Sequence, residues 1–255
     1  MKWEHKCSLD WLKKRQRFLT ASEIKSLLPV TKTGRPRVVG EQEYLKVMAG
    51  KMMELTEEDC YSYGPMARGH LLEPYAIEAL NRMLKEMQGE EHETFHWWDD
   101  EIVSLAGKGR VIAFSPDAMD IPMGNPARIP HAIAEVKSYT AERHIQVAYS
   151  PKELIEERWQ IATAMALLES IDHGYLVLFN PKMKFRKTFV IRFDRSELEK
   201  EIGMILDVEE KWMEFRETGP IMHRPPSGGV WSPYGGNEET IEKEIERRQR
   251  LNPVV

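Results

Sequence analysis

Apolar residues recur at intervals of three and four along six segments of the chain, which is the spacing of amphipathic helices. Thr20 and Glu23 have the three-residue spacing of a capping box, and Ser150 precedes Pro151, which suits a first helical turn. Pro74 lies inside another segment and is expected to kink that helix or mark a restart, because it has no N–H group. The predicted helices span residues 8–19, 20–28, 41–55, 66–87, 150–170 and 194–215.

In the middle of the chain the pattern changes to short apolar runs with alternating polar positions, which favours β-strands. Two runs flank a Gly-Lys-Gly turn, a third is "AIAEVK", and two more flank "NPKMKFR" as a β-hairpin. Strands surrounded by helices predict an α/β (α+β) fold, in which a mixed central sheet is flanked by helices. The predicted strands span residues 101–105, 110–115, 132–137, 174–180 and 187–193.

Length and composition fit one large domain with an appendage, because 255 residues with 42% hydrophobic content supply a sizeable core. We predict a domain over residues 1–217, with a helical region at about 1–60 and a core at about 61–217. A Pro/Gly-rich linker and a charged helix follow in 218–255. The first residues show no signal-peptide pattern, and no apolar run reaches membrane-spanning length. We therefore expect a cytoplasmic protein (host cytoplasm if phage-encoded) with no membrane association.

Charge is distributed unevenly along the chain. Residues 1–38 contain ten Lys or Arg against three Asp or Glu, a net +7, so the remaining residues carry −12 of the total −5. A basic arm on an acidic body suits phosphate binding at one end and metal binding by carboxylates elsewhere. A solvated polar helix explains the arm equally well. The two cysteines are too few for a disulfide framework or an iron–sulfur cluster.

Two stretches carry candidate chemistry, and the first is "HETFH". His92, Glu93 and His96 match the H-E-x-x-H zinc motif, which requires a helix. Here the motif runs into the aromatic, strand-like "WWDDEIVSL". On a strand the two histidines would lie roughly 13 Å apart, too far to share zinc. We interpret this stretch as a strand with surface histidines, and a zinc protease remains the less favoured alternative.

The second stretch is "IAFSPDAMD", followed downstream by "AIAEVK". Asp117 ends one apolar run, whereas Glu135 and Lys137 share one face of the next by alternation. Buried strands rarely accept charges unless these are paired or hold a metal. If the two strands pair, the carboxylates converge, and with a backbone carbonyl they form an oxygen-rich site suited to Mg²⁺ or Mn²⁺. Lys137 would then hold or deprotonate the attacking water.

"SPDA" followed by "EVK" resembles the PD-(D/E)xK nucleases, and more narrowly the phage λ exonuclease or YqaJ-type viral recombinase branch. "WLKKRQRFLTASEI", "ARGHLLEPYAIEAL" and "ERWQIATAM" resemble flanking blocks of that branch in the same order. The resemblance runs from Trp11 to about Leu168 and does not cover the residues after Thr218. It departs from the family pattern at Ala118, where Gly is usual, and at Ala162, where a second Gln is usual. The resemblance implies a restriction-endonuclease-like core.

The resemblance also implies roles for individual residues. It implies metal ligation by Glu73, Asp117, Glu135 and the Val136 carbonyl; catalysis by Asp117, Glu135, Lys137 and Gln160; and phosphate binding by Arg15, Arg17, Thr20 and Ser22. A forked guanidinium suits phosphate, and Ser22 lies in the first turn of a predicted helix, where free N–H groups favour anions. A capping role explains Ser22 about equally well.

A metal-dependent deoxyribonuclease is the activity that this resemblance implies. The enzyme would use two Mg²⁺ ions, for which Mn²⁺ can substitute, and would digest duplex DNA ends 5′→3′. The 3′ single strands that it leaves would serve phage-type recombination. The resemblance further implies a trimeric ring and a single-strand annealing protein as a partner. An endonuclease of the same superfamily and a non-catalytic DNA-binding scaffold are the alternatives.

Overall fold

The structure is a computed structural model that describes residues 8–31, 34–56, 59, 65–89, 91–98, 102–104, 108–122 and 129–218. The chain divides into two compact units, Met1–Met213 and Glu214–Val255. The described part of the second unit is the end of one helix, so the predicted linker and charged helix lie outside the described residues. None of the helices in the described ranges combines the length and apolar character needed to cross a bilayer.

Two sheets form the framework of the first unit. A five-stranded mixed sheet has the order β2-β5-β6-β7-β8, in which β6 and β7 are parallel and the other neighbours antiparallel. A three-stranded sheet has the order β1-β4-β3. The strands are β1 (Leu19–Thr20), β2 (His96–Trp97), β3 (Val103–Ser104), β4 (Ile112–Phe114), β5 (Ala118–Met119), β6 (Ala132–Lys137), β7 (His173–Phe179) and β8 (Thr188–Asp194). The predicted mixed sheet, the strand "AIAEVK" and the hairpin of β7 and β8 are confirmed.

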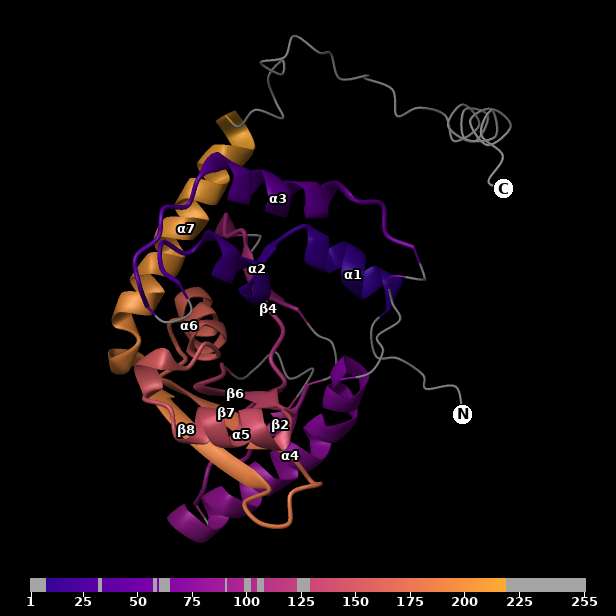
Figure 1. Ribbon diagram of the computed structural model, residues 1–255, viewed down its shortest axis with the longest axis vertical. Helices are drawn as coiled ribbons and strands as arrows, with labels where there is room; N and C mark the ends of the chain where they lie inside the picture. The colour runs from indigo at the N-terminus through magenta and orange to yellow at the C-terminus, as the bar shows by residue number, and fades with distance from the viewer. Residues whose placement is uncertain are drawn as a thin grey trace, which may run out of the picture. The chain divides into compact units, whose positions relative to one another are not determined.

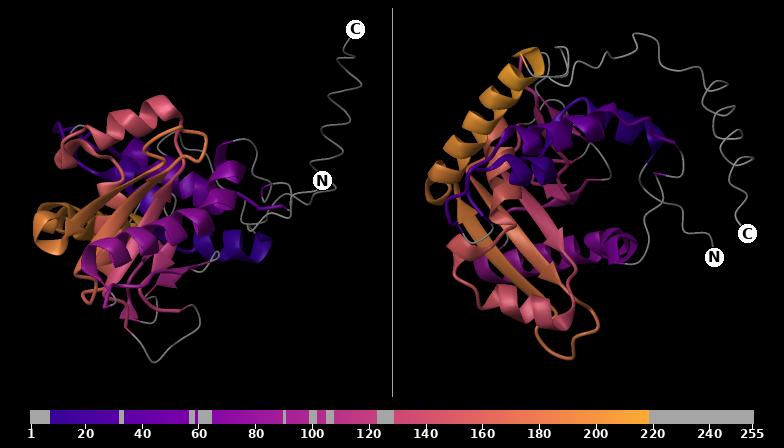
Figure 2. Two further views of the ribbon diagram at one scale, coloured as in Figure 1. Left: turned by 90° about the horizontal axis from the view of Figure 1, so that it is seen from below. Right: turned by 45° about the horizontal axis from the view of Figure 1, so that its top comes forward.

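Helices cover the sheets on both sides (Figures 1 and 2). The α-helices are α1 (Leu9–Gln16), α2 (Ala21–Leu27), α3 (Glu41–Met52), α4 (Pro65–Gln88), α5 (Ala141–Ala148), α6 (Arg158–Leu167) and α7 (Glu199–Thr218), and short 3₁₀ turns are η3 (Lys152–Leu154) and η4 (Arg195–Glu197). On one sheet face α4 packs against small and β-branched residues of β5, β6 and β7. On the other face of the five-stranded sheet α6 contacts β6 and β7, and it also contacts β4 of the three-stranded sheet.

Because α6 lies between several elements, it is buried on all sides, and small residues let it approach the sheet closely. Gly174 in β7 is the point of closest approach: a Cβ there would lie 2.5 Å from Ile161 Cγ2 of α6. On β6, Ala134 and Val136 point to the α4 face, so alternation directs Glu135 to the α6 face.

Local sequence signals explain where several elements begin. The predicted capping box is confirmed, because Glu23 accepts hydrogen bonds from the Thr20 backbone N–H at 2.8 Å and from its hydroxyl at 2.6 Å. The predicted turn before β4 contains Gly109 with φ of 78°, a left-handed conformation that favours glycine. Val103 and Ser104 pair with β4 in the antiparallel sense, as expected for strands that flank this turn.

Two local predictions need correction, and one of the two alternatives for Pro74 is excluded. The helix predicted over 150–170 is two elements, η3 and α6, because Ser150 donates its hydroxyl back to the Gln146 carbonyl of the preceding helix instead of capping a new one. No restart occurs at Pro74, since α4 continues through it. In the HETFH motif only His96 belongs to a strand, whereas residues 92–95 form neither strand nor helix. The helical geometry that a zinc protease needs is therefore not present in this motif.

Candidate active site

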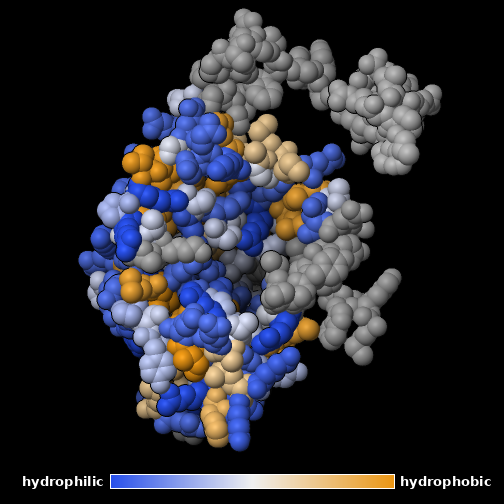
Figure 3. All heavy atoms as spheres, viewed as in Figure 1, coloured by the Kyte–Doolittle hydropathy of each residue, from blue (hydrophilic) through white to orange (hydrophobic). Residues whose placement is uncertain are grey.

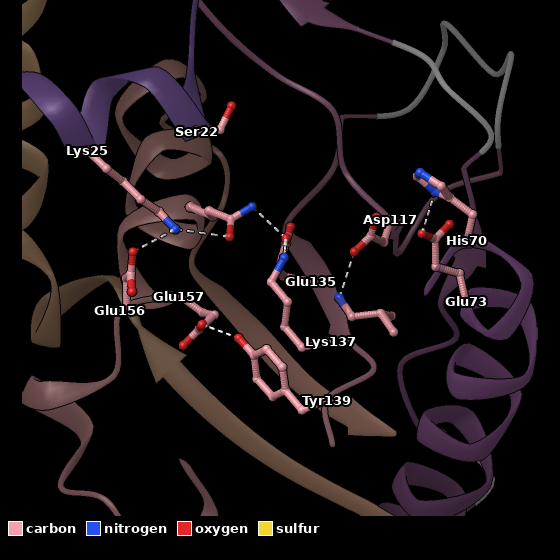
Figure 4. Close-up of polar contacts among 12 residues, drawn as sticks. Ser22, Lys25, His70, Glu73, Asp117, Glu135, Lys137, Tyr139, Glu156 and Glu157 are labelled. Atoms are coloured by element: carbon pink, nitrogen blue, oxygen red, sulfur yellow. Dashed lines mark hydrogen bonds and ion pairs between the residues drawn. The ribbon is translucent and has the colours of Figure 1, made fainter. Parts of the chain in front are cut away.

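Three charged side chains meet where β5 begins beside β6 (Figure 4). Asp117 lies in the turn that leads from β4 into β5, and Glu135 and Lys137 lie on β6. The antiparallel pairing of Ala118 with Ala134 places Asp117 next to the end of β6 that carries Glu135 and Lys137. The expected pairing of the strand before Asp117 with β6 is wrong, because β4 belongs to the three-stranded sheet. The two segments converge instead because β5, a short strand that was not predicted, follows Asp117 and pairs with β6.

The side chain of Asp117 forms a hydrogen bond to β6 in place of a backbone group of a neighbouring strand. Its Oδ2 accepts a hydrogen bond from the Val136 N–H at 2.7 Å. The Asp120 N–H donates to the Ala132 carbonyl, so these two residues form a hydrogen-bonded pair of the ladder. Such pairs recur at every second residue of an antiparallel ladder, and Pro116 therefore faces Val136 at a hydrogen-bonding position. Proline has no N–H group, so the Val136 carbonyl receives no strand hydrogen bond from that position. The turn thus leaves a backbone oxygen and a carboxylate next to each other.

Glu135 connects β6 to α6. It is 7% exposed, and its Oε1 accepts hydrogen bonds from the Lys137 ammonium and, at 2.6 Å, from Gln160 Nε2. Gln160 in turn accepts from Lys25 Nζ of α2 at 3.5 Å. The same ammonium lies 3.7 Å from Glu156. A chain of polar contacts therefore runs from β6 through α6 to α2.

Charge repulsion is concentrated at Asp117. Burial and the nearby carboxylates of Glu135 and Glu73 raise the pKa of Asp117 well above its usual value, although Lys137 and the Val136 N–H oppose the shift. Burial alone would lower the pKa of Lys137, but Glu135 and Asp117 raise it above its usual value. The lysine is therefore an ammonium that balances the carboxylates at neutral pH.

Glu73 approaches this cluster from α4 and is 8% exposed. Its carboxylate lies 2.9 Å from His70 Nδ1, one turn earlier, and accepts from Trp97 Nε1 of β2 at 3.3 Å. The glutamate is thus held in place by its neighbours, and its negative charge contributes to the raised pKa of Asp117. Figure 4 shows Glu73 and Asp117 on adjoining elements, with His70 beside them.

Several polar residues of the site were not predicted. Besides Lys25, Tyr139 belongs to it, because its hydroxyl donates to the buried carboxylate of Glu157 at the start of α6. Burial and Glu157 raise the pKa of Tyr139 above its usual value. A local signal existed for Lys25: it follows Ser22 by three residues, so both lie on one face of α2. Nothing local pairs Tyr139 with Glu157.

Three of the four predicted phosphate-binding residues are in contact through Ser22, because the Thr20 hydroxyl lies 3.2 Å from Ser22 Oγ. Arg15 Nη2 donates to Ser22 Oγ at 2.8 Å, so α1 and α2 bring a guanidinium and an exposed hydroxyl together. Arg15 also lies over the Trp11 ring at 4.9 Å. Thr20 is the capping residue of α2 and donates its hydroxyl to Glu23. Arg17 is exposed at the C-terminal end of α1.

The donor set limits which cofactor could be held. In the part of the chain that the structure describes, no three His, Cys, Asp or Glu side chains lie close enough together to hold a metal ion by themselves. The strands bring together two carboxylates, Asp117 and Glu135, and the Val136 carbonyl. These are hard oxygen donors, which fit Mg²⁺ or Mn²⁺ better than zinc. Burial and repulsion from Glu135 and Glu73 raise the pKa of Asp117, and a bound cation would relieve that repulsion.

Comparison with known proteins defines the fold. No protein-family model matches the chain, and no curated protein matches it. Among solved structures, the crystal structure of an alkaline exonuclease (LHK-Exo) from Laribacter hongkongensis aligns with a TM-score of 0.51 and 17% sequence identity over 85% of this chain and 100% of that chain. The structure of LHK-Exo in complex with dAMP aligns with the same values. The chain therefore has the mixed α/β fold of this alkaline exonuclease.

Proposed function

We propose that the chain is a metal-dependent DNA exonuclease that hydrolyses phosphodiester bonds from duplex ends. The observation that carries this proposal is the convergence of Asp117, in the turn before β5, with Glu135 and Lys137 on the neighbouring β6, together with the hydrogen bond from Gln160 to Glu135. The shared fold with an alkaline exonuclease supports it. Glu73, Asp117 and Glu135 bring three carboxylates close to the ammonium of Lys137, and the repulsion among them is costly to the fold, so their presence together favours a functional role.

Asp117, Glu135 and the Val136 carbonyl would hold Mg²⁺, for which Mn²⁺ can substitute, and Glu73 is the residue that would extend the site to a second ion. A divalent ion held there would supply an acidified water and neutralise charge on the phosphate. Within the protein, the Val136 N–H fixes the Asp117 carboxylate at 2.7 Å, and Gln160 fixes Glu135 at 2.6 Å. Both carboxylates are therefore oriented before substrate binds.

Lys137 and Lys25 supply the positive charge. The ammonium of Lys137 would contact the scissile phosphate and stabilise the charge that develops as water attacks phosphorus and the bond to the 3′-oxygen breaks. Lys25 reaches the same region from α2, and burial lowers its pKa, with Lys137 contributing in the same direction. Gln160 lies between the lysine of α2 and Glu135 and would orient the attacking water or the phosphate.

The 5′→3′ direction rests on Arg15 and Ser22. Their 2.8 Å contact forms a paired donor on α1 and α2 that suits a terminal 5′-phosphate. Ser22 lies one turn from Lys25, which contacts Gln160, so a phosphate held by this pair would lie at the border of the catalytic cluster. The 3′ single strand left behind would pass to an annealing protein in phage-type recombination, and a trimeric ring would keep the enzyme on its substrate.

An end-dependence assay tests the proposal. Linear duplex with 5′-phosphate ends, the same duplex with 5′-hydroxyl ends, and a closed circle are each incubated with Mg²⁺ or EDTA. We expect Mg²⁺-dependent loss of the phosphorylated linear duplex, with the circle intact and Lys137→Ala inactive. Arg15→Ala should remove the preference for the phosphorylated end. Cleavage of the circle would show that the protein is an endonuclease and not an exonuclease. If no substrate is cleaved, a DNA-binding scaffold without catalytic activity is favoured.

A further inference from the structure

The loop that joins β7 and β8 is strongly basic. Residues 180–187 have the sequence "NPKMKFRK", with four Lys or Arg and no acid, in a chain of net charge −5. The four cationic residues are exposed. On the neighbouring α5 the single acid, Glu142, accepts a hydrogen bond from Gln146. The loop is therefore a concentrated positive feature on a predominantly acidic protein.

Two exposed aromatic rings accompany this charge. Phe185 and Tyr149 are each 71% exposed. Arg186 Nη1 donates to the Tyr149 hydroxyl at 2.6 Å, which joins the loop to the end of α5. Lys184 Nζ lies 5.4 Å from the centre of the Phe185 ring. Figure 3 shows hydrophilic and hydrophobic side chains mixed at the lower end of the molecule, where this loop lies in Figure 1.

The conformation of the loop is defined by its own hydrogen bonds. Asn180 is 3% exposed, and its N–H donates to the Lys187 carbonyl at 2.8 Å. Its carbonyl and its side-chain oxygen accept from the N–H groups of Met183, at 3.2 Å, and Lys182, at 3.1 Å. Arg186 adopts φ of 52°, a left-handed conformation that is uncommon for a residue with a side chain. The Phe185 ring is therefore presented by an ordered turn.

The loop lies at the same end of the sheet as the candidate active site. Lys137 is opposite Leu178 in the parallel pairing of β6 and β7, so Pro181 is three residues, about 10 Å, further along. Asn180 Nδ2 donates to the carbonyl of Tyr139, two residues after Lys137, at 2.9 Å. The buried Asn180 thus connects the loop directly to the segment that leaves the active site.

We propose that this surface, residues 181–187 with Tyr149, binds unpaired nucleotides of the DNA strand next to the active site. Cationic side chains contact the backbone, and exposed rings stack on bases, which offer their faces only when they are unpaired. Duplex DNA would use the charges but not the rings, and a hydrophobic protein partner would not require four cations. The inference rests on the proposed function for the identity of the strand, and it identifies where the strand separated from the duplex would be held.

Binding is tested without hydrolysis, in EDTA, by fluorescence anisotropy with the full chain. The probes are a labelled 20-nucleotide oligothymidylate and a blunt 20-base-pair duplex. Phe185→Ala removes the ring and Phe185→Trp keeps one. The triple variant Lys182→Gln, Lys184→Gln, Lys187→Gln removes charge from the loop. The matched control, Lys200→Gln with Lys211→Gln and Arg216→Gln, removes three charges from exposed positions on α7.

We expect Phe185→Ala to weaken oligothymidylate binding about ten-fold, with little effect on the duplex and with Phe185→Trp close to wild type. The triple variant should lower the slope of log affinity against log salt by about 2, since each backbone contact to a single strand contributes about 0.7. Equal weakening of both probes, unchanged binding by Phe185→Ala, or an equal effect of the α7 control would overturn the proposal. Because no arm depends on cleavage, an inactive nuclease that still shows the Phe185 effect would refute the proposed activity and leave this surface standing.

Discussion

Glu209 of α7 holds β4, the strand that leads to the turn with Asp117, and its replacement should lower the stability of the fold. The side chain is 3% exposed. Its Oε1 accepts from the backbone N–H groups of Val111 at 2.7 Å and Ile112 at 3.1 Å, and its Oε2 accepts from Arg110 Nε at 2.8 Å. Ile112 begins β4, which runs into the turn with Asp117. We therefore consider Glu209→Leu and Glu209→Gln.

The free-energy cost follows from the groups left without an acceptor. The Ile112 N–H belongs to a fully buried residue, so the loss of its hydrogen bond costs about 1–3 kcal/mol. Val111 is half-buried, and the loss of the hydrogen bond from its N–H costs about 1 kcal/mol. The side chain of Arg110 is 26% exposed and keeps its hydrogen bond to the Ala166 carbonyl, so the loss of its contact with Glu209 adds only about 1 kcal/mol. Glu209→Leu should lower the free energy of unfolding by about 3–5 kcal/mol. Glu209→Gln keeps an oxygen for both amides and should cost about 1–2 kcal/mol.

Urea denaturation followed by far-ultraviolet circular dichroism at pH 7 measures both values. Glu210, the exposed neighbour on α7, supplies the control pair Glu210→Leu and Glu210→Gln, which should change stability by less than about 0.5 kcal/mol. The reasoning fails if Glu209→Leu costs less than about 1 kcal/mol. It also fails if Glu209→Gln is as costly as Glu209→Leu, because the hydrogen bonds donated by the two backbone N–H groups would then contribute nothing to stability.

Three further predictions concern the site and its surroundings. Asp117→Asn should raise thermal stability in Mg²⁺-free buffer at pH 7, since it removes a carboxylate whose pKa is raised by burial and by repulsion from Glu135 and Glu73, while lowering nuclease activity at least 100-fold; a lower melting temperature would contradict this. Lys25→Met should lower kcat/KM about 10- to 100-fold, the equivalent of one charge-assisted hydrogen bond. The variant should not be destabilised, because burial disfavours the Lys25 ammonium. Unchanged kinetics would show that the contact of Lys25 with Gln160 is only structural. The hydrogen bond from His173 lowers the pKa of Glu93, so this pair stabilises the fold above the usual glutamate pKa and loses that effect as pH falls through the lowered value. Glu93→Gln should therefore be less stable than wild type at pH 7 and converge with it in acid, as measured by melting temperature across pH; a constant difference would exclude the linkage.

Features that depend on a few neighbouring residues could be predicted from the sequence. The Thr20–Glu23 capping box, the strand Ala132–Lys137 and the β7–β8 hairpin all follow from spacing, alternation and turn residues. The helix predicted from Ser150 was wrong because the serine hydroxyl has an alternative acceptor in the preceding helix. Local rules do not decide between two acceptors that are both within reach.

The sequence by itself determined which acidic and basic side chains the proposed active site could use. It also determined that Glu135 and Lys137 lie on one strand face, because alternation along a strand is a property of the backbone. Only the tertiary structure decided that Asp117 bonds to the Val136 N–H, through the register of β5 on β6. Only the tertiary structure brought Lys25 to Gln160, which is 135 positions away along the chain. Such contacts depend on how α2 and α6 pack on the sheets, and packing is set by the shapes of many distant side chains together.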